Sequence, residues 1–344
     1  MWFIELSVKQ MENNFITGQR ALKRLLSDVK NDSVSHAYIL EGPKGIGKRT
    51  AAELFARAIH CTGAVRPCGQ CSACVKHRAK THPDIFFVEP EDNGNIKIDA
   101  VRQAADELYM RPRLAQRKVL IIDGADGMND AAQNALLKTF EEPPAYGTVV
   151  LLSENMQNLL PTIRSRGVKL LMEPFAAEKI QAFVKSRYPD MQDKSGFVAG
   201  YSGGIVGRAI EICEDEEFFE LRSRLINAAA RLAEGKESIL AAAEAFGVGQ
   251  RKVAAEHREA CLDILLSWLG DAASLKQGGR AVNVDCMESL KSFTSKITAG
   301  GALAALEAVE ETARGLNPSM KYDLWVMNML IKCWRNLHGY SSWS

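Results

Sequence analysis

The first half of the chain alternates short, continuously apolar runs with longer segments whose apolar residues recur every three or four positions. The apolar runs predict five strands, at residues 36–40, 84–90, 118–126, 147–155 and 167–174. The intervening segments 51–60, 98–112 and 130–144 have the spacing of amphipathic helices. Strands that are apolar throughout are typical of a parallel sheet covered by helices on both faces. The pattern therefore predicts an α/β domain.

The strand pattern ends after Pro174. Residues 175–235 are predicted to form short helices, and residues 236–338 to form longer helices rich in alanine, leucine and glutamate. Glycine-rich breaks are expected at residues 276–281 and 298–304. We predict three domains: an α/β domain at 1–173, a small helical domain at 174–235 and a helical C-terminal domain at 236–344.

Composition and charge add little that is specific. Hydrophobic residues make up 47% of the chain and charged residues 25%, and the formal net charge is +1. A charge so close to zero gives no global attraction to nucleic acid or membrane, so any such contact needs a local patch. The sequence has no apolar run of membrane-spanning length and no recognisable signal peptide. We therefore expect a cytoplasmic protein.

A phosphate-binding loop is predicted where the first strand meets the following helix. Gly42, Gly47 and Lys48 fit the pattern G-x-x-x-x-G-K-[ST], in which backbone N–H groups and the lysine bind phosphate oxygens. Arg49 stands where a magnesium-binding hydroxyl is expected, and a guanidinium offers no oxygen ligand and repels the cation. Thr50 lies about 100° further round the helix and is a poor substitute. The alternative is a chance glycine-rich turn.

The third strand carries an aspartate at its end. Asp123 stands at the position of a Walker B carboxylate, which helps to hold magnesium. ATPases of this type follow it with a glutamate that polarises the attacking water, but here Gly124 and Ala125 follow. Asp126 is close in sequence, but the sequence does not show that its carboxylate reaches that water. Arg49 and Gly124 together predict that magnesium handling and water activation are both lost.

Eight cysteines divide into two groups. One group has the spacing C-x6-C-x2-C-x2-C and comprises Cys61, Cys68, Cys71 and Cys74. Four thiolates fit a closed tetrahedral zinc site, which is structural because no ligand position stays open. Disulfides are the alternative, disfavoured in a cytoplasmic protein, and either His77 or His82 might replace a cysteine ligand. The scattered cysteines are predicted to be buried as small hydrophobes: Cys213, Cys261, Cys286 and Cys333.

Three arginines lie in segments where a functional role has to be weighed against that of an ordinary surface residue. Arg164 and Arg166 follow the fourth strand, at the end of the sheet where a nucleotide site is expected. Arg208 begins a predicted helix after a glycine-rich turn. From the pattern alone, ordinary solvated arginines are the better interpretation of all three.

Together these motifs resemble the bacterial clamp-loader subunits of the AAA+ class. The resemblance rests on "ITGQ", "SHAYILEGPKGIGK", the four-cysteine insert, "LLKTFEEPP", "LPTIRSRG" and "GGIVGRA", within residues 15–210. The segment "NPSMKYDLWVMNML" is similar to the last helices of that family. The resemblance implies a P-loop AAA+ domain with a parallel sheet, a small helical lid and an all-α collar.

The resemblance also implies roles for the matching residues. Gly42, Gly47, Lys48 and Asp123 correspond to a nucleotide site, here degenerate, which either binds ATP without hydrolysing it or is kept only for its fold. Arg166 corresponds to an arginine finger that reaches the ATP of a neighbouring subunit and stabilises charge on the transferring phosphate. Two further correspondences are to the sensor positions of the family, Arg208 for the second and residues 153–155 for the first.

The implied function is that of a structural and regulatory subunit in a five-membered ring. Its partners would be delta and tau/gamma subunits, with a sliding clamp and primer–template DNA contacted through the assembly. The ring would place the clamp on primed DNA, and the cysteines would hold structural zinc. The alternative is an active ATPase motor subunit of the tau/gamma type, against which Arg49 and Gly124 argue. A zinc-bearing DNA-binding module is a third reading, weakened by the net charge.

Overall fold

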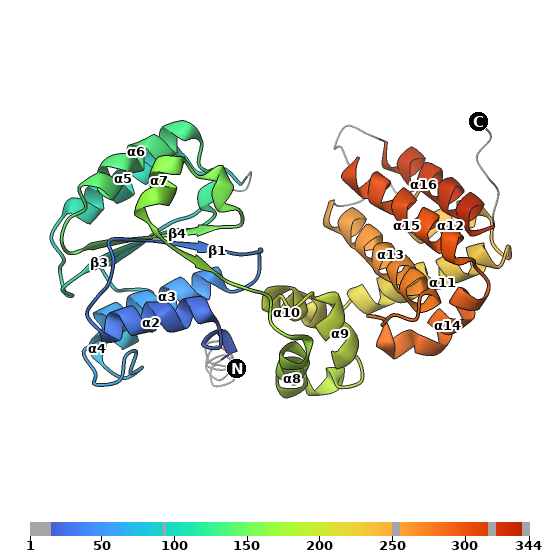
Figure 1. The fold of residues 1–344 in the computed structure, drawn as a ribbon, viewed down its shortest axis with the longest axis horizontal. Helices are drawn as coiled ribbons and strands as arrows, with labels where there is room; N and C mark the ends of the chain where they lie inside the picture. Colours follow the sequence, from blue (N-terminus) through green and yellow to red (C-terminus); the bar gives the residue numbers. More distant parts are fainter. Residues whose placement is uncertain (1–14, 92–93, 250–254, 316–320, 339–344) are drawn as a thin grey trace. The chain divides into compact units, whose positions relative to one another are not determined.

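The fold is that of a computed structural model, which describes residues 15–91, 94–249, 255–315 and 321–338 (Figure 1). The chain divides into two compact units. The first contains the described residues up to Phe175 together with Ile205–Gly207, and the second contains Ala176–Gly204 and the described residues from Arg208 onward. Each unit is described by itself. Within the described residues no helix is long and apolar enough to cross a membrane.

The first unit is built on a five-stranded parallel sheet. Its strands are β1 (Ala37–Glu41), β2 (Ile85–Val88), β3 (Lys118–Ile122), β4 (Gly147–Ser153) and β5 (Val168–Leu171). Their order across the sheet is β2-β3-β4-β1-β5, and every neighbouring pair is parallel. All residues of β3 and β4 are buried, as expected for central strands covered on both faces.

Helices cover both faces of this sheet (Figure 1). One face carries α2 (Arg20–Lys30), α3 (Lys48–His60) and α4 (Ser72–Arg78). The other carries α5 (Ile98–Tyr109), α6 (Asp130–Glu141) and α7 (Pro161–Arg166). The short helices η1 (Ala125–Gly127) and η2 (Met156–Asn158) follow β3 and β4. Local signals start these helices: Asn129 caps the Ala132 N–H of α6, and Pro161 opens α7.

Every described element of the second unit is helical. The elements up to the middle of the unit are α8 (Ala177–Arg187), η3 (Pro189–Met191), α9 (Ser195–Tyr201), α10 (Val206–Glu214), α11 (Phe218–Ala233) and α12 (Ile239–Glu244). The remainder are α13 (Ala255–Lys276), η4 (Val284–Cys286), α14 (Met287–Ser295), α15 (Ala299–Arg314) and α16 (Tyr322–Leu337). Helix α10 begins in the segment that belongs to the first unit.

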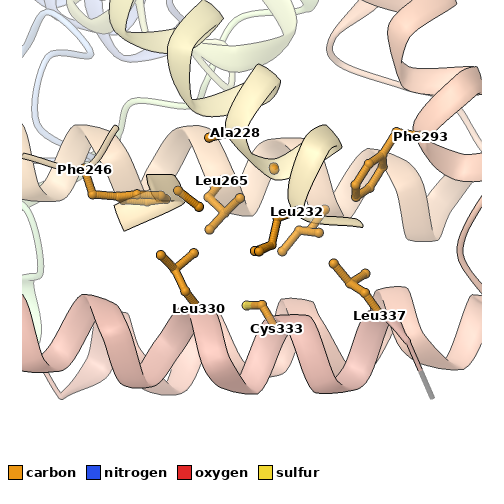
Figure 2. A pocket seen from close by; sticks show the side chains of 11 residues that line it. Ala228, Leu232, Phe246, Leu265, Phe293, Leu330, Cys333 and Leu337 are labelled. Carbon is orange, nitrogen blue, oxygen red and sulfur yellow. The ribbon is translucent and has the colours of Figure 1, made fainter. Parts of the chain in front are cut away.

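The core of the second unit contains a small apolar cavity (Figure 2). Its volume is about 20 Å³, and side chains from α11, α13 and α16 line it, among them Leu232, Leu265 and Leu330. Cys333 also faces this space. A space so small and apolar holds no polar partner for a ligand, so we regard it as a packing defect of the core.

The predicted α/β fold with a parallel sheet and a helical C-terminal region is confirmed. The glycine-rich break expected at residues 298–304 falls at the start of that segment, because α14 ends at Ser295 and α15 begins at Ala299, with the glycines in its first turn. One local prediction, about the cysteines, was wrong. Cys286 is partly exposed, unlike the other three scattered cysteines. The three-domain division remains a prediction.

A buried carboxylate fixes the loop between α5 and β3. Asp84 is fully buried and accepts hydrogen bonds from the backbone N–H groups of Arg113, Leu114 and Ala115, at 2.7–2.8 Å. Burial alone would raise the pKa of Asp84, but these three hydrogen bonds lower it overall. The carboxylate thus supplies the acceptors that three loop amides would otherwise lack.

Replacing Asp84 with alanine is expected to lower the free energy of unfolding by about 1–3 kcal/mol, because buried amides lose their acceptor. The contribution of Asp84 is fully present above the unfolded-state pKa of about 3.9 and is lost as the pH falls through its lower folded-state pKa. Urea unfolding from pH 7 to pH 3 measures both effects. Asp106→Ala, at an exposed position of α5, is the control. Equal stability of the two variants at pH 7 would contradict the prediction.

Candidate functional site

The predicted phosphate loop joins β1 to α3 at the carboxyl edge of the sheet. Gly47 adopts a left-handed conformation with φ of 99°, and a Cβ there would lie 2.3 Å from Cδ1 of Ile16. A Cβ on Gly42 would lie 2.8 Å from the carbonyl oxygen of Met172. Position 47 therefore requires glycine for its backbone conformation, and position 42 for lack of space beside a backbone oxygen.

Lys48 begins α3 and is buried beneath this loop. Its Nζ donates hydrogen bonds to the carbonyl oxygens of Gly42 (2.7 Å) and Pro43 (3.1 Å). Burial lowers the pKa of Lys48, and the nearby carboxylates of Glu154, Asp123 and Asp126 partly offset this effect. In this structure the amine is therefore held by the oxygens of its own loop.

Arg49 is held by carboxylates from three different elements. Its guanidinium lies 2.5 Å from Glu89, 3.2 Å from Glu53 and 3.5 Å from Asp123. Glu53 lies one turn further along α3, and Glu89 and Asp123 directly follow β2 and β3. The guanidinium also lies over the ring of Phe87, 5.2 Å from its centroid. The side chain at the expected magnesium position is thus an integral part of an ion-pair network.

The residues after Asp123 form a tight turn that is tied to the end of β4. Gly124 adopts a left-handed conformation with φ of 62°. The carboxylate of Asp126 accepts hydrogen bonds from the backbone N–H of Glu154, at 3.1 and 3.2 Å. Asp126 therefore ties the turn after β3 to the end of β4.

The candidates for the first sensor position differ in their surroundings. Ser153 is buried at the end of β4, and its hydroxyl has no hydrogen-bond partner among the described residues. Its carbonyl oxygen accepts from the backbone N–H of Gly42, which joins β4 to the loop. The side chain of Asn155 instead accepts from the N–H of Gln157 and caps η2. Only Ser153 of these two thus contacts the phosphate loop.

The loop is also contacted from the segment Ile205–Gly207. The N–H of Gly207 donates to the carbonyl oxygen of Gly45 at 2.8 Å, and a Cβ on Gly207 would lie 2.8 Å from Gly45. Arg208 belongs to the second unit, where it forms an ion pair with Asp263 at 2.7 Å. The guanidinium of Arg208 therefore has a partner within its own unit.

Arg166 lies at the end of α7, on the sheet face opposite to α3 (Figure 1). Its side chain is about 38% exposed, forms an ion pair with Glu141 at 3.1 Å and donates to the carbonyl oxygen of Thr162. Arg164 instead donates to the side chain of Gln157. The structure thus brings Lys48, Arg49 and Asp123 together, whereas Arg166 belongs to α7, a helix on the other face of the sheet.

The four clustered cysteines converge on one point. Their sulfur atoms all lie within 4.8 Å of one another, with 3.9 Å between Cys61 and Cys71 and 4.0 Å between Cys68 and Cys74. Tetrahedral zinc with Zn–S bonds of about 2.3 Å needs sulfur–sulfur distances of about 3.8 Å. All four thiols are free, so the disulfide alternative is not what the structure contains. The donor set fits a divalent metal ion.

Backbone amides surround these sulfurs. Cys61 Sγ accepts from the N–H groups of Gly63 and Cys68, and Cys68 Sγ accepts from that of Cys71. The amide of Cys74 chiefly lowers the pKa of Cys71 to about 5, whereas burial raises the pKa of Cys74 to about 12. Amide donors of this kind stabilise negative sulfur, which is the form that binds metal.

Three histidines form a separate cluster beside the cysteines. Nδ1 of His60 lies 2.8 Å from Nε2 of His77, and the ring of His82 stacks on that of His60. Burial and the neighbouring rings lower the pKa of His60 to about 4 and that of His77 to about 3. Nδ1 of His82 accepts the N–H of Asp84, so a neutral ring carries its proton on Nε2. These uncharged rings pack together, and the four sulfurs converge without them.

Two partners of the site were missed in the sequence. Glu89 and Glu53 hold Arg49, and neither belongs to a recognised motif. The carboxyl ends of parallel strands meet at one edge, so the acidic residue just after the second strand was a detectable signal. Glu53 stands four residues after Arg49, which is the spacing of a helical ion pair.

Comparisons with known proteins agree with this architecture. The family model described as "DNA polymerase III, delta subunit" matches residues 17–176, and that of "DNA polymerase III, delta subunit, C terminal" matches residues 216–334. The DNA polymerase III subunit delta' of Bacillus subtilis is 30% identical over 312 residues, which cover 88% of this chain and 91% of that protein.

Two further relatives match over shorter stretches of the chain. The subunit delta' of Pseudomonas aeruginosa is 44% identical over 138 residues, covering 39% of this chain and 42% of that protein. The subunit tau of Bacillus subtilis is 33% identical over 154 residues, covering 44% of this chain and 27% of that protein. Because a relative 30% identical is matched along almost its whole length, the chain belongs to the family of DNA polymerase III clamp-loader subunits.

Proposed function

We propose that the chain is the delta-prime type of clamp-loader subunit, which does not hydrolyse ATP itself and assists a neighbouring ATPase. The observation that carries this proposal is the ion pair between Arg49 and Asp123, at the position of a magnesium ion. Gly124 adds a second deficit, because it offers no carboxylate for water activation. The match to a delta' subunit over 312 residues supports this type over the tau/gamma type, for which the matches found cover 135–173 residues.

The catalytic contribution would come from Arg166, acting in trans. Its half-exposed guanidinium is held only by surface partners, Glu141 and Thr162 among them, so it is accessible to another chain. Its position on the sheet face opposite to α3 supports action on a neighbour's nucleotide and not on the chain's own loop. A guanidinium with several N–H donors suits the developing charge on a transferring phosphate.

The assembly would be a five-membered ring with delta and tau/gamma subunits. Residues 174–235 would form the lid and residues 236–344 the collar through which the subunits associate. The ring would open a sliding clamp and place it on primer–template DNA. With a net charge of +1, this subunit would share any DNA contact with the assembled ring along the phosphate backbone. Arg208 would stand at the second sensor position without a catalytic duty.

The cysteine cluster would hold one structural zinc ion. Cys61 follows α3 and Cys74 lies in α4, so the metal would cross-link the end of α3 to the short helix after it. All four ligand positions would be protein sulfurs, which leaves none for a substrate. The zinc would therefore stabilise this insert and take no part in phosphate chemistry.

The isolated chain is expected to hydrolyse ATP at less than about 0.01 per second, against roughly 1–1,000 per second for typical enzymes. The reason is the absence of both a magnesium hydroxyl and a water-activating glutamate at its loop. Release of phosphate by purified chain, with a tau/gamma subunit as positive control, measures the rate. ATPase activity of ordinary rate that copurifies with the chain and is abolished by Lys48→Ala would refute the proposal.

Arg166→Ala is expected to leave ring assembly intact and to lower clamp-stimulated ATP hydrolysis by the reconstituted ring at least about twofold, because one site loses its finger. Arg166→Lys should be similarly defective, since a lysine keeps the charge and lacks the planar fork. Arg164→Ala, two positions earlier in the same helix, is the matched control and should retain stimulation. Unchanged turnover with Arg166→Ala would show that the finger assignment is wrong.

Metal analysis of carefully prepared protein is expected to find one zinc ion per chain. Cys71→Ser should release it and expose the insert to proteolysis, because the donor set loses one of its four thiolates. Cys286→Ser alters a cysteine that belongs to the other unit and not to the cluster, and it should retain full zinc content. Metal-free protein with an ordered, protease-resistant insert would refute the zinc assignment.

A further inference from the structure

Three carboxylates surround the guanidinium of Arg49, much as carboxylates surround a bound metal cation. Glu53, Glu89 and Asp123 converge on the guanidinium from α3, the end of β2 and the end of β3. These side chains are about 28–51% exposed, so each pair contributes little to stability. Their significance is positional, because three separate elements direct oxygens at the same point.

The position of that point matters. In a magnesium-dependent loop, the hydroxyl after the lysine and the aspartate after β3 hold the metal between them. Here the guanidinium extends from the hydroxyl position and reaches the aspartate, 3.5 Å from Asp123. Phe87, over which the guanidinium lies, limits its movement on another side. A magnesium ion in contact with Asp123 would have to displace this charge.

The remaining charges around the loop are unfavourable to a nucleotide without metal. Lys48 is occupied by two loop carbonyl oxygens. The carboxylates of Asp123, Asp126 and Glu154 lie near enough to Lys48 to raise its pKa against the effect of burial. A triphosphate without metal would therefore be repelled by the excess of carboxylates around the loop. A magnesium-bound triphosphate would find the guanidinium of Arg49 at the position that its magnesium ion needs.

We propose that Arg49 is a tethered counter-ion that substitutes for the divalent cation at Asp123 and thereby excludes metal-bound nucleoside polyphosphates from the loop. This inference rests on the proposed function, since it explains how a subunit with an intact glycine loop and lysine neither binds nor hydrolyses magnesium-bound ATP. Arg49 is on this view the residue that determines which ligand the loop accepts. The excluded ligand class is a nucleoside di- or triphosphate carried with a hard divalent cation.

Removing the tethered charge separates binding from hydrolysis. Arg49→Thr restores the hydroxyl ligand and frees Asp123, Glu53 and Glu89 for a metal ion. Hydrolysis is not restored, because Gly124 still offers no carboxylate. The variant is therefore expected to bind nucleotide in a metal-dependent manner and to turn it over no faster than the parent chain.

The test uses the full chain with a fluorescent ADP analogue, titrated in Mg²⁺ and in EDTA. Arg49→Thr should bind the analogue at least about tenfold more tightly in Mg²⁺ than in EDTA, whereas the parent chain should show no such ratio. Arg49→Lys retains a tethered cation and is the matched control, expected to behave like the parent. Mn²⁺ alone, followed by loss of its free electron paramagnetic signal, should bind to Arg49→Thr and not to the parent.

A second measurement does not depend on nucleotide. Asp123→Asn should lower the midpoint of thermal unfolding in the parent chain, because it removes a partner of Arg49. In the Arg49→Thr background the same change should be neutral or stabilising, since it relieves repulsion between carboxylates. Equal effects in both backgrounds, or metal-dependent nucleotide binding by the parent equal to that of Arg49→Thr, would overturn the inference.

These outcomes are distinguishable from failure of the proposed function. A parent chain that hydrolyses ATP at an ordinary rate refutes the functional proposal directly. A parent chain that binds magnesium nucleotide without turnover leaves the structural-subunit proposal standing and refutes only the role of Arg49.

Discussion

The parallel orientation of the five strands is the constraint on which this site depends. Because neighbouring strands run in the same direction, their carboxyl ends meet at one edge of the sheet. The loop after β1, Glu89 after β2, Asp123 after β3 and Glu154 after β4 are all collected there. The edge thus concentrates negative charge, and the chain neutralises part of it with side chains of α3. Whether such an edge binds a nucleotide depends on how far lysine and arginine side chains of the chain already neutralise its carboxylates.

The two faces of the sheet separate two kinds of chemistry. Helices α3 and α4 lie on one face with the phosphate loop and the cysteine cluster, and α7 with Arg166 lies on the other. Ile163 of α7 is buried against this second face, in the apolar core built by α5 and α6. The packing of α7 therefore fixes the location of Arg166 independently of the loop. A substitution in the loop can therefore leave the position of Arg166 unchanged.

Much of this was accessible from the sequence, for identifiable reasons. The strands were predictable because central strands of a parallel sheet are apolar at every position, as in "KVLII" and "GTVVLLS". The cysteine cluster was predictable because C-x2-C turns bring their sulfur atoms to one point. The partners of Arg49 were only partly predictable. Sequence spacing signalled Glu53 and Glu89 singly, but the convergence of Glu53, Glu89 and Asp123 on one guanidinium depends on strand order, which is set by long-range packing. The capping of α15 by Thr298 was overlooked because adjacent glycines suggested a break.

The left-handed turn at Gly124 determines how readily the loop could accommodate a carboxylate after Asp123. Arg49 differs from a magnesium ligand only in its side chain, on a backbone that is already helical. A glutamate at position 124 would have to adopt a φ of 62°, which costs a non-glycine residue of order 1–3 kcal/mol. A Cβ there would meet Pro90 at an ordinary contact distance of 3.5 Å, so the backbone conformation and not lack of space sets this cost. A carboxylate at position 124 would thus require the turn itself to be reshaped, whereas a hydroxyl at position 49 would require only a change of side chain.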